Sequence, residues 1–157
     1  MGVSSSFIHD TNMLYFNRIR RKNWRQKILI EVYTDGASSG NPGMSGAGVY
    51  ILASGKIYTY TFPLGILSNH EAEFQAVIKA LEICKVHFPD EILSFRSDSQ
   101  VVVDVIENSF TKNKQFHPLL KTINEAASHF PYFFIKWIPE KKNKQADQLA
   151  KKAIHMQ

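Results

Sequence analysis

Four acidic side chains could do chemistry together if the fold brings them to one place. Asp35 and Asp98 each follow an apolar, strand-like run, whereas Glu73 and Asp147 fall in the first turns of two amphipathic segments. Carboxylates that lie close together repel and raise one another's pKa unless cations neutralise them. Ligand sets made only of oxygen favour hard ions such as Mg²⁺ or Mn²⁺. Two such ions, about 4 Å apart, can assist an in-line displacement at phosphorus.

Each of these acids also has an ordinary structural explanation. Asp98 could cap the helix that follows it, and Asp147 could interact with the positive end of a helix dipole. Glu73 could be a solvated helix residue, and Asp35 could begin a turn. One such explanation would suffice for a single acid. Four acids, each at a predicted sheet edge or helix start, favour a shared site.

The elements that must position these acids follow from hydrophobic periodicity. Alternating or apolar runs rich in β-branched and aromatic residues predict five strands. Apolar residues at helical spacing predict four helices, the first of them opened by a capping box of Ser68 and Glu71. The predicted strands are 28–34, 47–53, 56–62, 91–98 and 132–138, and the predicted helices are 68–85, 99–107, 115–129 and 143–155.

The order of these elements, β-β-β-α-β-α-α-β-α, predicts an α/β fold. A tight turn at residues 54–55 makes the first strands antiparallel, and strand–helix–strand crossovers make the later strands parallel. We therefore expect a mixed five-stranded sheet with helices on both faces. The strands that precede Asp35 and Asp98 should be neighbours, with their carboxyl ends side by side. The nearly continuous apolar run 132–138 predicts a strand buried on both faces, with Trp137 in the core.

Five glycines fall in residues 36–48, directly after Asp35. Glycine allows backbone to approach a bulky ligand closely, which is the role we expect here. A phosphate-binding loop is excluded because the stretch lacks the Gly-Lys-Ser/Thr ending and leads into a strand.

Charge and composition divide the chain into two parts. Residues 1–27 carry six basic side chains and one acidic one, so they account for the whole net charge of +5. We expect a poorly ordered basic arm at 1–26, which is either a contact for a polyanion or a solubilising tail, and one domain at 27–157. The single Cys84 is expected in the core and indicates a reducing compartment. Without an apolar run long enough for a membrane span or a secretory signal, the predicted location is cytoplasmic.

Four motifs resemble the signature blocks of type 1 ribonuclease H, in that family's order. They are YTDGASSGNPG, NHEAEFQAVIKAL, SDSQVV and NKQADQLAKKA, and the resemblance extends over residues 28–154. Within the family, the chain is most similar to small stand-alone bacterial ribonuclease H-like proteins.

The resemblance implies a ribonuclease H-like fold and a metal-dependent endoribonuclease that cuts the RNA strand of RNA/DNA hybrids. Two Mg²⁺ or Mn²⁺ ions would act with the substrate and leave 5′-phosphate and 3′-hydroxyl ends. An RNA/DNA hybrid is then the expected partner, with no membrane and no obligate protein partner. The implied catalytic and metal-binding residues are Asp35, Glu73, Asp98 and Asp147, and the implied minor-groove contacts are Asn41, Asn69 and Gln100.

The chain departs from the family pattern in ways that keep a second hypothesis open. Residues 138–146 contain no histidine, which many members carry before the last acid, so Glu140 or Lys141 would have to substitute. Residues 108–115 are too short for the basic, tryptophan-bearing handle of some members. Lysines at 141, 142 and 144 could contact phosphates or belong to a solvated loop. The alternative function is therefore a non-catalytic or weakly active nucleic-acid-binding module on the same fold.

Overall fold

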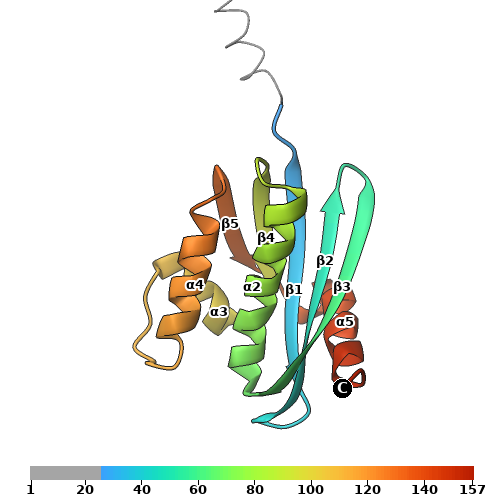
Figure 1. Ribbon diagram of the computed structural model, residues 1–157, viewed down its shortest axis with the longest axis vertical. Coiled ribbons are helices and arrows are strands. Elements are labelled where there is room, and N and C mark those ends of the chain that lie inside the picture. The colour runs from blue at the N-terminus through green and yellow to red at the C-terminus, as the bar shows by residue number, and fades with distance from the viewer. Residues whose placement is uncertain (1–25) are drawn as a thin grey trace, which may run out of the picture.

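A five-stranded mixed sheet runs through residues 26–157, the part of the chain described in a computed structural model (Figure 1). The strand order is β3-β2-β1-β4-β5; β1, β2 and β3 are antiparallel, and β4 and β5 run parallel to β1. The predicted fold class is therefore confirmed. The predicted basic arm lies outside the described residues. The strands are β1 Leu29–Ser38, β2 Gly43–Ala53, β3 Lys56–Leu67, β4 Ile92–Ser97 and β5 Tyr132–Trp137.

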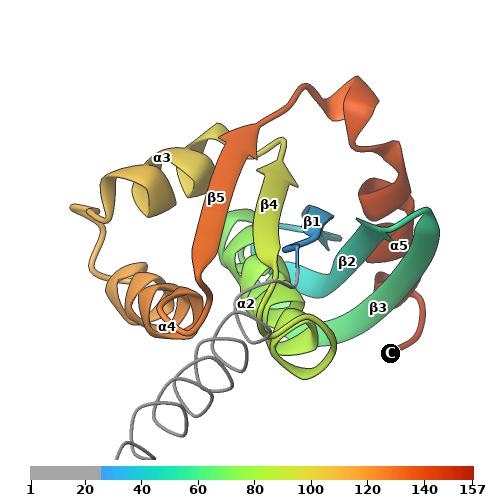
Figure 2. The same ribbon diagram turned by 90° about the horizontal axis from the view of Figure 1, so that it is seen from above.

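Helices cover both faces of this sheet, as predicted. Seen from above, α2, α3 and α4 lie on one side, and α5 lies on the other, beside β2 and β3 (Figure 2). The crossover from β3 through α2 to β4 places β4 next to β1. The helices are α2 Asn69–His87, α3 Gln100–Asn108, α4 His117–Ala127 and α5 Lys144–Ile154, with a 3₁₀ turn η1 at Glu140–Lys142.

Local sequence signals set the turns and the first helix. The two residues between β2 and β3, Ser54 and Gly55, have φ values of 49° and 77°. Positive φ at both positions is the conformation of the tight hairpin turn that matches strand twist. Helix α2 begins with the predicted capping box, in which the Ser68 hydroxyl accepts from the Glu71 N–H at 3.2 Å and the Glu71 carboxylate accepts from the Ser68 N–H at 2.9 Å.

The core lies between α2 and the sheet. Phe74 and Leu81 of α2 are fully enclosed against side chains such as Val32 of β1 and Phe95 of β4. Cys84 is buried in the same cluster, as predicted, and burial raises the pKa of its thiol to about 12. This contact fixes α2 across β1, which carries Asp35, and β4, which Asp98 directly follows.

Two glycines of the loop and strand region make room for helices rather than for a ligand. A Cβ atom on Gly36 would lie 2.2 Å from the carbonyl carbon of Ala72 in α2. A Cβ atom on Gly48 would lie 2.2 Å from the carbonyl oxygen of Ala146 in α5. The expectation of ligand approach is wrong at these two positions, because the helices that carry the remaining acids already occupy the space.

Strand β5 differs from its prediction because it lies at the edge of the sheet. Tyr132 and Phe134 are 53% and 58% exposed, and their stacked rings have centroids 6.5 Å apart. Trp137 is 48% exposed, so its predicted place in the core is wrong. An apolar run predicts burial on both faces only when helices cover both faces; here α5 packs on β1, β2 and β3 and leaves Tyr132 and Phe134 uncovered on its side of the sheet. Trp137 lies on the other face, as the last residue of the strand.

Candidate metal centre

Three carboxylates converge at the end of the sheet where β1 and β4 stop pairing. Asp35, Glu73 and Asp98 each offer an oxygen, and these oxygens all lie within 4.8 Å of one another. The parallel pairing of β1 with β4 ends at the pair Thr34 and Ser97, so Asp35 and Asp98 follow side by side, as predicted. Strand β1 itself continues to Ser38 through its pairing with β2, so the predicted end of the strand applies only to the β4 side.

Glu73 reaches this cluster because α2 lies directly on β1. The backbone N–H of Gly36 donates to the Glu73 carboxylate, with 3.2 Å between N and Oε2. The same glycine leaves the space in which the α2 backbone at Ala72 sits. A residue with a side chain at position 36 would push the helix, and Glu73 with it, away from Asp35.

Burial and mutual repulsion disfavour negative charge in this cluster. The pKa of Asp35 is raised to about 10, first by burial and then by the charges of Glu73, Asp98 and Asp147. The pKa of Glu73 is raised to about 8, first by burial and then by the charge of Asp98, against a lowering by the Gly36 N–H. Burial also raises the pKa of Asp98. Without cations, Asp35 and Glu73 therefore keep protons near neutral pH.

The donor set fits a hard divalent cation. All three groups are carboxylates, and carboxylate oxygens are the ligands that Mg²⁺ and Mn²⁺ prefer. A cation would also offset the repulsion that, after burial, raises the pKa values of Asp35 and Glu73. Asp35 is 4% exposed, and the charges of all three other predicted acids act on it, so it is the central group of the arrangement.

The fourth predicted acid, Asp147, lies near the cluster but outside the group of three. It sits in the first turn of α5, and its Oδ2 is 2.8 Å from the Nζ of Lys151, one turn further along the helix. This i,i+4 ion pair raises the pKa of Lys151. The charge of Asp147 still contributes to the raised pKa of Asp35, which places it in electrostatic range.

Asn143 is a site neighbour that the sequence reasoning did not identify. It precedes α5 and is fully buried, and its Nδ2 donates to the carbonyl of Thr34 at 2.9 Å. This bond ties the start of α5 to β1, one residue before Asp35. Its amide also lowers the pKa of Asp98, against the effect of burial. A polar residue at the start of a predicted helix, four positions ahead of an acid, was the available signal.

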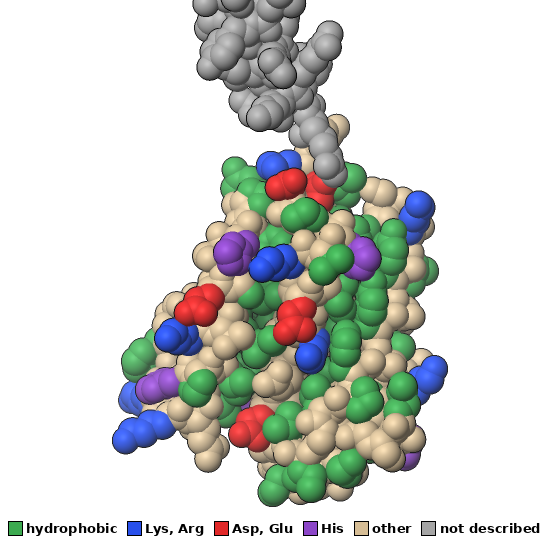
Figure 3. All heavy atoms as spheres, viewed as in Figure 1, with side chains coloured by type: hydrophobic (Ala, Val, Ile, Leu, Met, Phe, Trp, Pro, Cys, Tyr) green, Lys and Arg blue, Asp and Glu red, His purple; other side chains and the backbone are tan. Residues whose placement is uncertain are grey.

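An open hollow of about 440 Å³ borders Asp147. Its other lining residues are Glu140, Lys141, Lys144 and Gln148. Lys141, Lys142 and Lys144 are all exposed, as a phosphate contact would require, and a solvated loop would expose them equally. The face over α2 and α4 presents basic and acidic side chains interspersed rather than a single-sign surface (Figure 3).

The three predicted substrate contacts are exposed, and each lies within a few residues of a site carboxylate along the chain. Asn41 lies in the β1–β2 connection, and its Oδ1 accepts from the backbone N–H of Asn69 at 3.0 Å. Asn69 begins α2, four residues before Glu73. Gln100 begins α3, two residues after Asp98, and its Nε2 donates to Asp104 at 2.7 Å.

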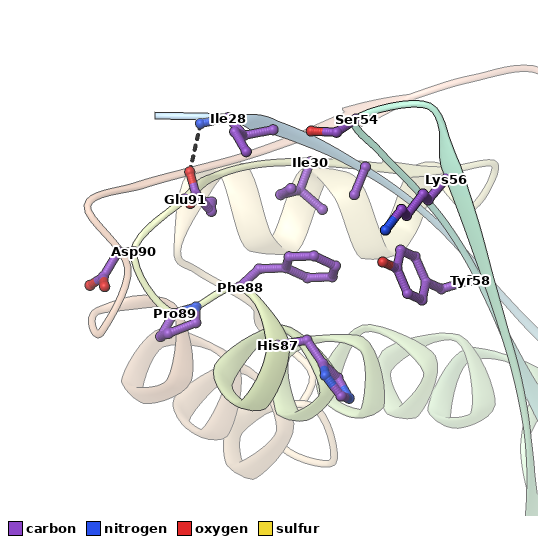
Figure 4. A pocket seen from close by; sticks show the side chains of 11 residues that line it. Ile28, Ile30, Ser54, Lys56, Tyr58, His87, Phe88, Pro89, Asp90 and Glu91 are labelled. Atoms are coloured by element: carbon purple, nitrogen blue, oxygen red, sulfur yellow. Dashed lines mark hydrogen bonds between the residues drawn. The ribbon is translucent and has the colours of Figure 1, made fainter. Parts of the chain in front are cut away.

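A second hollow, of about 280 Å³, lies at the opposite end of β1 from Asp35. Figure 4 shows the Phe88 ring on its floor, with Tyr58 and Lys56 on the β3 side. At its rim, the backbone N–H of Ile28 donates to Glu91 at 2.6 Å. This hollow is separate from the carboxylate cluster, and we assign it no part in the candidate site.

A β3-β2-β1-β4-β5 sheet with carboxylates where β1 and β4 diverge defines the ribonuclease H-like class of proteins. A family model described as reverse transcriptase-like matches residues 33–153. The chain therefore belongs to this family of ribonuclease H-like proteins. Among the described helices, none is both long and apolar enough to cross a membrane.

Relatives and solved structures agree with this assignment. The chain is 39% identical over 127 residues to a protein of Enterococcus faecalis named "Putative hydrolase EbsB", covering 80% of this chain and 94% of that protein. The crystal structure of RNase H1 from Halobacterium salinarum superposes with a TM-score of 0.76 at 29% identity, covering 82% of this chain and 99% of that one. LC11-RNase H1, solved in complex with an RNA/DNA hybrid, also gives a TM-score of 0.76 at 29% identity, covering 81% and 97%.

Proposed function

We propose that this protein hydrolyses the RNA strand of RNA/DNA hybrids with the help of two divalent ions, leaving 5′-phosphate and 3′-hydroxyl ends. The observation that carries the proposal is the convergence of the Asp35, Glu73 and Asp98 carboxylates within 4.8 Å. The hybrid-bound LC11-RNase H1, which has the same fold, supports the choice of substrate.

The roles of the acids follow from their environments. Asp35 is the most buried, and the charges of the other three all act on it, so it would be the central ligand of the ions. Glu73, Asp98 and Asp147 would complete the ligand set. When bound, the ions would supply an activated water for attack on the scissile phosphate and stabilise the leaving 3′-oxygen.

Recognition of the hybrid would come from exposed amide side chains. Asn41, Asn69 and Gln100 each offer both a donor and an acceptor, which suits 2′-hydroxyl groups and base edges in a minor groove. Contacts with 2′-hydroxyls would distinguish the RNA strand from DNA.

One observation favours the second candidate, a non-catalytic or weakly active nucleic-acid-binding module. Asp147 is paired with Lys151 and stands outside the three-carboxylate group. A carboxylate that is already paired with a lysine binds a metal ion less readily, so the second of the two ions would be held weakly. In that case the protein would bind hybrids but cut them slowly or not at all.

The deciding experiment is cleavage of a labelled RNA/DNA hybrid by the full chain, with Mg²⁺, Mn²⁺ or EDTA. Single-stranded RNA and double-stranded DNA serve as comparison substrates. Asp98→Asn keeps the shape of the side chain but removes its charge. Its rate of hybrid cleavage should therefore fall by more than the roughly 10–100-fold that is lost when an outer-shell partner of a metal is replaced. Asp90→Asn is the matched control, because Asp90 is exposed at the other end of the sheet. Metal-independent cleavage, or equal rates in the two variants, would contradict the proposal.

A further inference from the structure

Trp137 ends β5 with an exposed ring and an anchored polar end. Its indole N–H donates to the backbone carbonyl of Asp98, with 3.1 Å between Nε1 and O, although the residue is 48% exposed. The β4–β5 ladder ends at the pair Ser97 and Trp137. The indole bond therefore extends the connection between the two strands by one residue, onto the residue that carries a site carboxylate.

Asp98 belongs neither to β4 nor to α3, so its position depends on bonds like this one. Before it, the Ile138 N–H donates to the Ser97 carbonyl at 2.9 Å. Around it, the Ser99 N–H donates to the Ser97 hydroxyl at 3.1 Å. The Trp137 indole holds the carbonyl of Asp98 itself. Without the indole bond, the Asp98–Ser99 peptide keeps the Ser99 N–H bond but loses its anchor on the carbonyl side, so the Asp98 carboxylate is less firmly fixed relative to Asp35 and Glu73.

We propose that Trp137 is a positioning residue that sets the affinity of the carboxylate cluster for divalent ions through the Asp98 peptide. The inference rests on the proposed function, because it concerns the same site. A ring that only filled space would be expected in the core, whereas this one is half exposed and directs its single donor to the site.

The first test compares Trp137→Phe with wild type. Phenylalanine keeps an aromatic ring on β5 and removes the N–H. The loss of one hydrogen bond of ordinary strength corresponds to about fivefold weaker Mg²⁺ binding. This affinity is measured from the rise of Tm with Mg²⁺ concentration, because an ion that binds only the folded state stabilises it. With the hybrid, kcat at limiting Mg²⁺ should fall, KM for the hybrid should stay unchanged, and excess Mg²⁺ should restore kcat.

Phe134→Leu is the matched control on the same strand. Phe134 is 58% exposed and lies three residues before Trp137, on the opposite face of the sheet. Like Trp137, Phe134 is an exposed aromatic residue, but its ring stacks on Tyr132 instead of bonding to the site. Its substitution should leave Mg²⁺ affinity at the wild-type value, even if the unfolding free energy changes.

The second test uses the indole itself as the probe. The chain has two tryptophans, so Trp24→Phe leaves Trp137 as the single indole. Neutralising the carboxylates next to the bonded indole changes the field on the ring. Mg²⁺ should therefore shift the emission of Trp137 saturably, with the same midpoint as the Tm curve. The added substitution Asp98→Asn should abolish that shift.

The outcomes separate this inference from the proposed function. If wild type binds Mg²⁺ and cleaves the hybrid but Trp137→Phe shows the same ion affinity, the positioning role is overturned and the function stands. A lower unfolding free energy with unchanged ion affinity overturns the positioning role as well, because it indicates packing alone. If neither Tm nor the emission of Trp137 responds to Mg²⁺ in the protein with Asp98 intact, the positioning role is overturned, and the proposed function falls as well only if the hybrid is not cleaved with Mg²⁺ or Mn²⁺.

Discussion

Asp35→Asn should make the ion-free protein more stable at neutral and alkaline pH while removing the central carboxylate of the candidate site. Asp35 is 4% exposed, and its pKa is raised from 3.8 to about 10 by burial and by neighbouring carboxylates. A carboxyl with a higher pKa in the folded state binds protons more tightly there than in the unfolded state. As far as Asp35 is concerned, wild type is therefore most stable below about pH 3.8, and its unfolding free energy falls progressively as the pH rises towards 10.

The size of the effect follows from linkage. Each proton held only by the folded state changes the unfolding free energy by about 1.4 kcal/mol per pH unit. Between about pH 5 and pH 8, one such group lowers the unfolding free energy by at most about 4 kcal/mol. An effective dielectric constant near 20 makes the actual decrease smaller. Glu73, with its pKa raised to about 8, acts with the same sign. We expect wild type to lose about 1–3 kcal/mol over this range, and Asp35→Asn to show a clearly shallower slope and about 1–2 kcal/mol more stability than wild type near pH 8.

The assay is urea unfolding of both proteins across this pH range, in excess EDTA and in excess Mg²⁺. Ions that bind the folded wild type should stabilise it and reverse the order of the two proteins. Asp90→Asn controls for the loss of an exposed acid, and it should follow the wild-type slope. Parallel slopes for wild type and Asp35→Asn in EDTA would refute the reasoning, because Asp35 would then not titrate in a buried, repulsive cluster.

Three further predictions test packing, recognition and charge. Gly36→Ala should lower the unfolding free energy measured in urea by more than about 3 kcal/mol, because its Cβ would lie 2.2 Å from the Ala72 carbonyl carbon. Gly55→Ala is the control and should cost only about 1 kcal/mol, because its φ is 77° but the added Cβ would meet open space. Gln100→Ala should weaken hybrid binding or cleavage without a matching fall in Tm, and a collapse of Tm would make the residue structural. Removal of residues 1–26 should make the log–log salt dependence of hybrid affinity shallower by roughly 2–3 if three of its basic residues contact phosphates; identical slopes would exclude a binding role.

The sheet and the meeting of three acids were predictable because each depends on local patterns. Alternation marked β1 and β4, and the crossover through α2 left these strands as parallel neighbours. Once that is fixed, Asp35 and Asp98 must emerge side by side. Glu73 follows from the capping box of Ser68, which sets where α2 begins and hence which of its turns faces the strand end.

Other features depend on contacts that a single sequence does not reveal. The apolar run of β5 is compatible with a central strand, and only the strand order shows that it is an edge. The apolar pattern alone therefore predicts Trp137 in the core, although its indole bonds to Asp98. The pair of Asp147 with Lys151 is an i,i+4 pattern that is visible in the sequence. Its effect on the candidate site depends on the placement of α5 against β2, which Gly48 permits.

The same packing that builds the site makes it costly without ions. Gly36 lets α2 lie on β1, which brings Glu73 to Asp35 and covers both from water. That cover raises their pKa values, so the ion-free site holds protons instead of charge. Looser packing would relieve the repulsion but would also separate the carboxylates. Cation binding would therefore stabilise a site with this geometry, and the pH dependence of folding and the affinity for Mg²⁺ should change together in any variant that alters the contact between α2 and β1.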